Sequence, residues 1–343
     1  MKTRIFTLLA LTAIVLCTQN ANATIRRVGY FGTPRPTDYI DLQNAHDAAA
    51  AGDTILMFPG SWGAAYSKRL VTLGYGYFVD TASLTTGANF GLQNITAGLS
   101  IGITLAAGSN NSTFEGLDGL SIHGDGSGAT LSNITIRRCN IGNGLGLYGT
   151  NTFANWQVLQ SYITYFQVGG SSITNIVVNN CYIYQIYNPG FGAPISLTGQ
   201  FNNCIYYYVD FSNGSFIIRN SIFTLNRVND INCAYSNNVI NTDYGSLPGN
   251  GNVNISGYSM VTDVFVGYSD QSTYSNDGRF ALKPGSPAIG AGVGGTNCGI
   301  FGGANPYKLS GIPRIPAFYK LTAPSNITST NPYTITFSVR SNN

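Results

Sequence analysis

The sequence predicts an all-β fold, a right-handed parallel β-helix in which successive coils stack into a solenoid. Two observations support this: a loose repeat of 20 to 22 residues through the middle of the chain, and an unusual composition. Of 343 residues, 42 are Gly and only 9% are charged, while Asn, Ser, Thr and Tyr are abundant. Such a composition disfavours helices and favours strands separated by polar turns.

Residues 1–23 read as a cleavable secretory signal peptide. Lys2 and Arg4 precede an apolar run at 5–16, and the small residues of 21–23 follow it. The run is shorter than the roughly 18 to 20 residues that span a bilayer, so we expect no transmembrane segment. The mature protein should begin near Thr24 and be secreted or displayed at the cell surface.

Charge excludes some partners. Removal of the signal peptide leaves 17 − 2 = 15 basic and 14 acidic residues, a net charge of about +1. A nearly neutral chain has no electrostatic footprint for nucleic acid or for an anionic membrane. We expect a monomer, because a solenoid with both ends covered has no need to oligomerise.

The cysteines predict free thiols. Five remain after the signal peptide, an odd number that excludes complete pairing within one chain. Cys17 as a lipid-attachment site is disfavoured by the bulky Leu16 before it. The absence of CxxC or Cys/His clusters argues against structural zinc.

Near the N-terminus, residues 38–51 predict a helix. Thr37 or Asp38 is expected to cap its first turn and Gly52 to end it. A short strand at 53–58 should follow. The helix is expected to cover the open end of the stack, whose unpaired backbone groups would otherwise promote aggregation.

The repeat itself aligns four segments without gaps, with starts separated by 22, 20 and 40 residues, the last interval fitting two coils of 20. Segments 111–118 and 233–240 extend it in both directions. One such unit cannot bury its own apolar face, so the coils must stack. The four segments are 133–142, 155–164, 175–184 and 215–224.

Stacking turns the alignment into columns of equivalent residues. We expect two aliphatic core columns, one from Ile136 to Ile218 and one from Ile141 to Phe223, and an amide ladder at a turn. A third column consists of small side chains, and we call it the small column. Cys139 and Cys181 lie two coils apart in it, roughly 9.6 Å, too far for a disulfide, so both should be free and buried. The small column contains Cys139, Ser161, Cys181 and Ser221, and the amide ladder contains Asn133, Asn155 and Asn175.

After about residue 245 the repeat fades into a Gly- and Pro-rich stretch. Segment 281–316 is expected to wrap over the last coils as an irregular cap, and 333–339 to add a final strand. The expected organisation is a β-helix domain at 24–320 and a C-terminal strand or tail at 321–343.

Motifs at both ends resemble a known family. Residues 42–60, with GDTI and a closing PG, look like the entry of pectin-lyase-like β-helix proteins. The PGSPAIGAG motif within 282–292 resembles the end of the helix in secreted bacterial β-helix proteins, and 302–321 is similar to exported proteins of the Bacteroidetes group. The family includes polysaccharide lyases, glycoside hydrolases and surface proteins of no assigned activity, so the fold alone does not choose among them.

The resemblance implies where chemistry would lie. The family's lyases hold calcium with acidic residues and use Arg or Lys as a base, and its hydrolases use clustered aspartates with a nearby His. Calcium follows from the resemblance alone. Carboxylates in this stretch would act as acid and base or as calcium ligands. In the competing structural interpretation, Glu115 and Arg137 stack 22 residues apart as a surface ion pair, and residues 123–128 form a turn. The catalytic candidates are Glu115, Asp118, His123, Asp125 and Arg137.

Tyrosines suggest a second kind of contact. Outward-facing aromatic rings on a rigid sheet stack on sugars, although tyrosine is also a favourable strand residue. The sequence thus favours an exported, non-catalytic surface protein that contacts glycans. The alternative is a polysaccharide lyase or glycoside hydrolase acting on an acidic polysaccharide. The candidate glycan contacts are Tyr182, Tyr184, Tyr206 and Tyr208.

Overall fold

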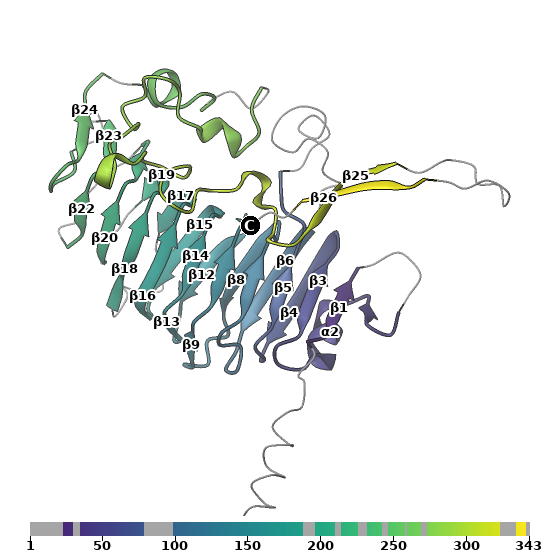
Figure 1. Cartoon of the computed structure of the whole chain (residues 1–343). Coiled ribbons are helices and arrows are strands. Elements are labelled where there is room, and N and C mark those ends of the chain that lie inside the picture. The colour runs from purple at the N-terminus through teal and green to yellow at the C-terminus, as the bar shows by residue number, and fades with distance from the viewer. Residues whose placement is uncertain are drawn as a thin grey trace, which may run out of the picture.

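The computed structural model describes residues 23–29, 35–78, 99–187, 196–209, 214–225, 232–241, 246–257, 259–268, 273–322 and 334–340. Over these residues the chain forms a parallel β-solenoid of about seven turns (Figure 1). All but one residue of the predicted signal peptide lie outside the described ranges. Among the described residues no helix has the length and apolarity needed to cross a membrane.

Two long parallel sheets run the length of the solenoid. The first has, in spatial order, β2 (Asp38–Tyr39), β1 (Ile25–Val28), β3 (Thr54–Met57), β5 (Val71–Leu73), β7 (Thr113–Glu115), β10 (Thr135–Arg137), β14 (Gln157–Leu159), β16 (Ser172–Asn179), β18 (Ser196–Asn202), β20 (Ser215–Arg219) and β22 (Ala234–Ser236). In addition, β13 (Thr152–Ala154) pairs with β16, and β9 (Thr130–Ser132) pairs with β13. The second runs from β4 (Gly60–Tyr66) through β6 (Leu99–Leu105), β8 (Leu120–Gly124), β12 (Gly144–Tyr148), β15 (Tyr162–Gly169), β17 (Tyr182–Tyr187), β19 (Ile205–Val209), β21 (Ile222–Phe223) and β23 (Val239–Asn241) to β24 (Val253–Ile255), with β11 (Asn140–Ile141) beside β15.

The predicted register is confirmed. Thr113, Thr135, Gln157 and Val177 are successive partners in the first sheet. The interval of 40 residues does hold two coils, but they are unequal: 200 − 177 = 23 and 217 − 200 = 17. Coil length varies because turns outside the strands absorb insertions without changing the pairing.

Both aliphatic columns form the core, as predicted. Alternation turns every second side chain of a strand inward, and parallel pairing stacks these side chains along the axis. Burying each one contributes roughly 1.5 to 3 kcal/mol. The fully or almost fully buried members are Ile136, Val158, Val178 and Ile218 in one column and Ile141, Ile163, Ile183 and Phe223 in the other.

Left-handed residues turn the chain at both ends of the first-sheet strands. Asn133, Asn155 and Asn175 have φ between 55° and 58°, and the Asn175 amide donates to Asn155 Oδ1 at 2.7 Å. The predicted ladder is confirmed between Asn155 and Asn175, and all three residues take the left-handed region that asparagine tolerates better than most residues. A second left-handed column, which we call the corner column, follows each strand. It contains Arg138, Gln160, Asn180, Asn203, Asn220 and Asn237.

The small column follows the corner column and closes the turn with hydrogen bonds. Ser161 Oγ donates to the carbonyl two residues earlier at 2.8 Å and accepts the Cys139 N–H, one coil earlier, at 3.2 Å. Cys181 Sγ repeats both contacts. Cys139 and Cys181 are free and buried, as predicted, and Cys204 joins them in the coil after Cys181. Burial raises the pKa of the Cys139 thiol to about 12, so the thiol is unreactive.

The N-terminal helix is shorter than predicted. Helix α2 spans Leu42–Ala48, and Asp41 caps it by accepting the Asn44 N–H at 2.9 Å. Asp38 belongs instead to β2, because both of its carboxylate oxygens accept hydrogen bonds from Arg27 of β1 at 2.6 Å. Ala49 is already extended, so the helix ends before Gly52. The helix lies against β1, β2 and β4.

The C-terminal segment 288–316, here called the strap, does more than contact the last coils. It runs back along the solenoid beside the corner column, from Asn237 to Glu115 (Figure 1). Beyond it, β25 (Ala317–Thr322) and β26 (Thr336–Arg340) pair as a separate antiparallel hairpin. The predicted boundary between 320 and 321 therefore falls within β25, and the predicted final strand joins this hairpin.

Short helical turns complete the C-terminal region. The first two lie before the strap, and Phe280 of the second stacks on Tyr182 of β17. They are η2 (Met260–Val264), η3 (Gly278–Phe280), η4 (Val293–Gly295) and η5 (Leu309–Gly311).

Candidate functional site

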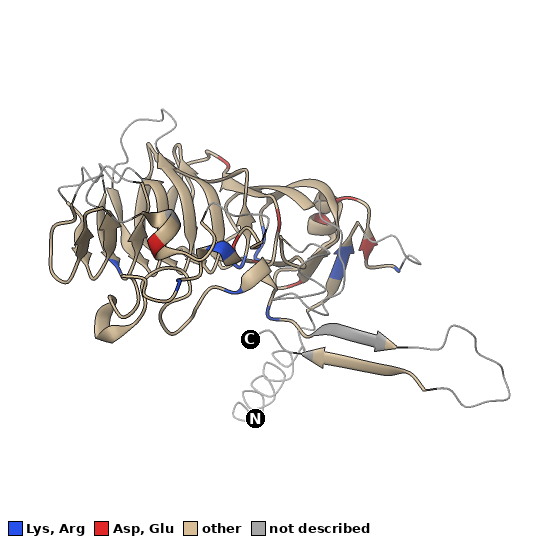
Figure 2. Ribbon diagram, turned by 90° about the horizontal axis from the view of Figure 1, so that it is seen from above, with Lys and Arg blue, Asp and Glu red and all other residues tan. Residues whose placement is uncertain are grey.

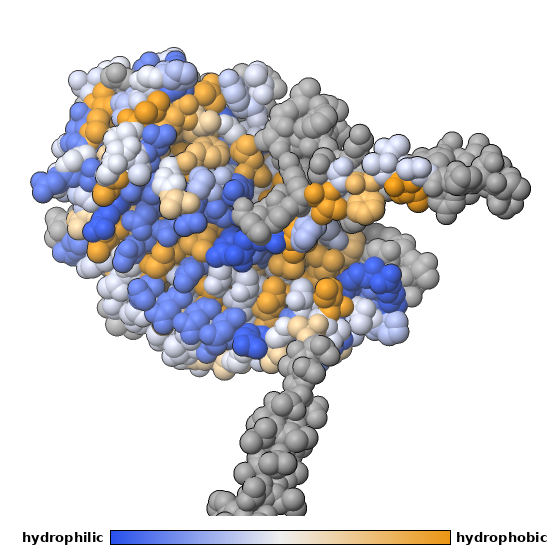
Figure 3. All heavy atoms as spheres, in the orientation of Figure 1, coloured by the Kyte–Doolittle hydropathy of each residue, from blue (hydrophilic) through white to orange (hydrophobic). Residues whose placement is uncertain are grey.

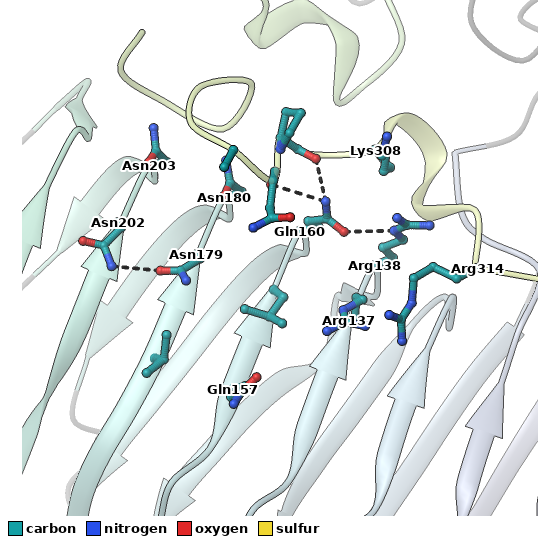
Figure 4. A pocket seen from close by; sticks show the side chains of 15 residues that line it. Arg137, Arg138, Gln157, Gln160, Asn179, Asn180, Asn202, Asn203, Lys308 and Arg314 are labelled. Carbon is teal, nitrogen blue, oxygen red and sulfur yellow. Dashed lines mark hydrogen bonds between the residues drawn. The ribbon is translucent and has the colours of Figure 1, made fainter. Parts of the chain in front are cut away.

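A groove of about 770 Å³ lies between the strap and the outer face of the first sheet (Figure 4). Its lining is cationic and rich in amides, and none of the described residues that line it is a carboxylate. The four cationic residues are Arg137, Arg138, Lys308 and Arg314, and the seven amides are Gln157, Gln160, Asn179, Asn180, Asn202, Asn203 and Asn305.

Alternation along the strands places the floor of the groove. Because Ile136 points into the core, Arg137 points outward, and its partners in the next coils do the same. Those partners are Leu159, Asn179 and Asn202. The Asn202 amide donates to Asn179 Oδ1 at 3.0 Å, which begins an amide ladder along the axis.

The strap forms one wall of the groove, and side chains of the corner column hold it by hydrogen bonds to its main-chain carbonyls. Gln160 Nε2 donates to the Pro306 carbonyl at 2.6 Å, and Asn180 Nδ2 donates to the Ile300 and Gly302 carbonyls at 2.8 Å each. Arg138 links the two systems, because it donates to Gln160 Oε1 and to the Ile312 carbonyl, both at 2.9 Å. These polar side chains satisfy backbone groups that an irregular buried segment would otherwise leave unpaired.

Glu115 fastens the far end of the strap. The residue is only 3% exposed, and its side chain accepts the Arg314 N–H at 2.8 Å and guanidinium hydrogen bonds at 3.2 to 3.3 Å. The prediction of a surface ion pair between Glu115 and Arg137 is therefore wrong, although the two residues do stack as strand partners. The strap covers Glu115 and supplies Arg314 in place of Arg137.

Arg137 is consequently a free cation at the groove. Its main-chain carbonyl accepts hydrogen bonds from Gly116 and Cys139, but its guanidinium has no hydrogen-bond or ion-pair partner among the residues that the structure describes. Burial, and next the charge of Arg314, lower the pKa of Arg137, and burial also lowers the pKa of Arg138. Both directions show that positive charge is crowded and partly desolvated here.

Local charge contrasts with the rest of the molecule. Four cations against Glu115 leave 4 − 1 = +3 around the groove, on a mature chain of about +1. Most of the ribbon in Figure 2 is uncharged, and several blue segments lie near its middle. The surface view, in the orientation of Figure 1, shows a strongly hydrophilic area near the middle of the molecule (Figure 3).

Asp118 and His123 lie away from this groove. Asp118 follows the corner, where it accepts hydrogen bonds from Asn140 Nδ2 at 2.7 Å and from the Gly119 N–H at 3.0 Å, and burial raises its pKa. His123 lies on the second sheet, where its ring stacks with Tyr148 and burial lowers its pKa.

Asp125 stabilises a turn. It accepts hydrogen bonds from the N–H and hydroxyl of Ser127 and from Asn151 Nδ2, and the Ser127 hydroxyl contributes most to lowering the pKa of Asp125. Of the five catalytic candidates, Arg137 alone lines the groove. The other four lie along successive parts of one coil and do not line it.

The tyrosine candidates divide into two pairs. Tyr182 is 3% exposed and its ring stacks on Tyr162 and on Phe280, while Tyr206 is fully buried in the core. These two cannot contact a glycan at the surface. Tyr184 and Tyr208 are 38% and 45% exposed on the second sheet, so the prediction stands for them.

Sequence reasoning missed most of the groove. Arg138, Gln160 and Asn180 follow one another at the same place in consecutive repeats, and that column was the available signal. The positions of Lys308 and Arg314 at the groove could not be predicted, because nothing in a Gly- and Pro-rich segment indicates which coil the segment lies against.

Among the described residues, no three His, Cys, Asp or Glu side chains gather as metal ligands. No family model, curated protein or solved structure matches this chain.

Proposed function

We propose that this chain is an exported right-handed parallel β-helix of the pectin-lyase-like kind that binds acidic polysaccharides in the strap groove without cleaving them. The observation that supports this is the groove's lining of four cations and seven amides without a carboxylate. Guanidinium groups bind carboxylate and sulfate in bidentate geometry, and amides bind sugar hydroxyls.

The groove's shape suits a polymer. Its floor contains equivalent residues from successive coils, which repeat about every 4.8 Å along the axis. Arg137, Asn179 and Asn202 belong to one such row. A rigid row of this kind is pre-organised, so little conformational entropy is lost on binding.

Catalysis lacks its usual partners at this place. A hydrolase needs two carboxyl groups on either side of the scissile bond. Glu115 is covered and bound to Arg314, and Asp118 and Asp125 do not line the groove. Binding without cleavage is therefore the function that the arrangement favours.

The first experiment is binding of residues 24–343 to a panel of acidic and neutral polysaccharides, with and without calcium. We expect Arg137→Gln to weaken binding of acidic polymers about tenfold. Arg219→Gln is the matched control, because Arg219 follows Asn202 in the same row but does not line the groove. Equal affinity of wild type and Arg137→Gln for every acidic polymer would refute the proposal.

A lyase is the second candidate, and Arg137 favours it. A base must lose its proton to act, and burial, followed by the charge of Arg314, lowers the pKa of this guanidinium. Incubation with acidic polysaccharides, followed by the absorbance of unsaturated products, tests it. Product formed by wild type and lost in Arg137→Gln would establish the enzyme.

Tyr184 and Tyr208 extend the glycan proposal to a second surface. Tyr184 stacks on Tyr207 of the next coil at 4.7 Å, so the rings are held rigidly. We expect Tyr184→Ala with Tyr208→Ala to weaken binding of neutral polysaccharides several-fold. Binding of acidic polymers in the groove should be unchanged in this variant, and an unchanged affinity for every neutral polymer would remove these tyrosines from the proposal.

A further inference from the structure

Asp53 is a buried carboxylate at the N-terminal end of the solenoid, and its two oxygens accept hydrogen bonds from different donors. The residue is 3% exposed. Oδ2 accepts from Arg26 Nε at 3.1 Å and from the Ala50 N–H at 3.0 Å, whereas Oδ1 accepts from Thr24 N at 2.9 Å. Burial raises the pKa of Asp53, but these hydrogen bonds outweigh burial and hold it below its ordinary value.

The nitrogen of Thr24 is held in this position by the sheet. Strand β1 begins at the next residue, where Ile25 pairs with Thr54, and the Thr24 carbonyl accepts the Thr54 N–H at 2.9 Å. Ala23, immediately before, is exposed. Among the described residues, the first strand thus begins two residues after the predicted signal peptide ends.

We propose that the exported chain is cut at the Ala23–Thr24 bond and that the Thr24 ammonium so created forms an ion pair with Asp53. A signal peptidase hydrolyses this amide with one water molecule, leaving a carboxylate on Ala23 and, after protonation at neutral pH, an ammonium on Thr24. A neutral donor to Oδ1 becomes a charged one without any movement of the chain.

Charges around the pair favour this exchange. Arg26 is the nearest cation, but it reaches Oδ2 and also donates to the Tyr39 hydroxyl at 2.8 Å. Arg27 is bound to Asp38. The ammonium takes the oxygen that Arg26 leaves to Thr24. The hydrogen bond, charged until then only at the Asp53 carboxylate, becomes an ion pair with a charge on both groups. This inference does not depend on the groove.

The test compares two otherwise identical proteins, one beginning at Thr24 and one at Ala23, so that the Thr24 nitrogen is an amine or an amide. Denaturant unfolding should give the Thr24 form a folding equilibrium constant about tenfold larger. The difference should vanish when both carry Asp53→Asn. Equal stability of the two forms with Asp53 intact overturns the proposal.

A second measurement needs no substitution that impairs folding. Amine-reactive labelling followed by mass spectrometry should modify the amino group of Thr24 several-fold more slowly than that of the Ala23 form, because the ammonium is bound. The mass of the exported protein should correspond to a start at Thr24. Equal labelling rates, or a different start, would also overturn it.

Discussion

At the scale of single residues, the small column shows why some side chains are interchangeable and others are not. Serine and cysteine both occur in it because each donates to the carbonyl two residues earlier and accepts an N–H from the preceding coil. The position needs a small side chain that both donates and accepts. It does not need the chemistry of a thiol, and burial keeps that chemistry suppressed.

We expect Cys181→Ser to leave stability within about 1 kcal/mol of wild type, because serine makes the same two contacts. Cys181→Ala should cost about 1 to 3 kcal/mol, since the buried Ser161 N–H loses its acceptor. Denaturant unfolding of both variants checks this. A serine variant as unstable as the alanine variant would show that sulfur itself matters.

Acidic residues at the N-terminal end predict an acid-sensitive sheet edge. The hydrogen bond from Arg27 contributes most to lowering the pKa of Asp38. A lowered folded pKa gives stability that is present above the unfolded value of about 3.9 and is lost as pH falls through the folded one. Asp38→Asn should therefore flatten the acid limb of the unfolding curve, and an unchanged limb would exclude this pair as its source.

At the scale of elements, the strap is held by two carboxylates of opposite character. Asp277 accepts the Ser310 N–H and the Ser275 hydroxyl, yet its burial raises its pKa. Glu115 instead binds the Arg314 guanidinium. One anchor thus holds the strap with neutral donors, and the other with a charged one.

The raised pKa of Asp277 makes folding stability decrease as pH rises. The folded protein holds a proton on Asp277 at pH values where the unfolded chain has lost it, so stability falls between about pH 3.9 and the raised folded pKa. Asp277→Asn should remove this part of the pH dependence. Unfolding measured from pH 4 to pH 7 tests it, and an identical slope in wild type and variant would contradict it.

Glu115→Gln should loosen the strap selectively. It removes the charge that Arg314 binds, and we expect a loss of about 1 to 2 kcal/mol, discounted because Arg314 is half exposed. Hydrogen exchange should increase in residues 304–316, whereas strands of the second sheet such as β15 should exchange as in wild type. Uniform acceleration across both would mean that the strap is not a separate unit.

For the whole molecule, the sequence repeat determined which parts of the structure could be predicted. Strand register, both core columns and the Asn133 to Asn175 turn followed from the sequence, because a parallel stack turns spacing along the chain into neighbours in space. The limits of the helix at 42–48 did not follow, since Arg27 binds Asp38 from another strand.

The groove could not be predicted for a similar reason. Arg137 was found because it lies in a repeat, but its pairing with Glu115 was overturned by Arg314, which lies 199 residues from Glu115 in the chain. Contacts of this range lack periodicity. They depend on the path of an irregular segment, and local propensity does not encode that path.

The corner column grips the strap almost wholly by carbonyl oxygens, which every residue type provides. The track of the strap is thus indifferent to the identity of the side chains that it displays over the groove. Lys308 could be exchanged for an acid, an aromatic or a serine while the scaffold stayed in place. In evolutionary terms, ligand preference is uncoupled from foldability, and a solenoid of this kind can diversify its recognition by point mutation alone.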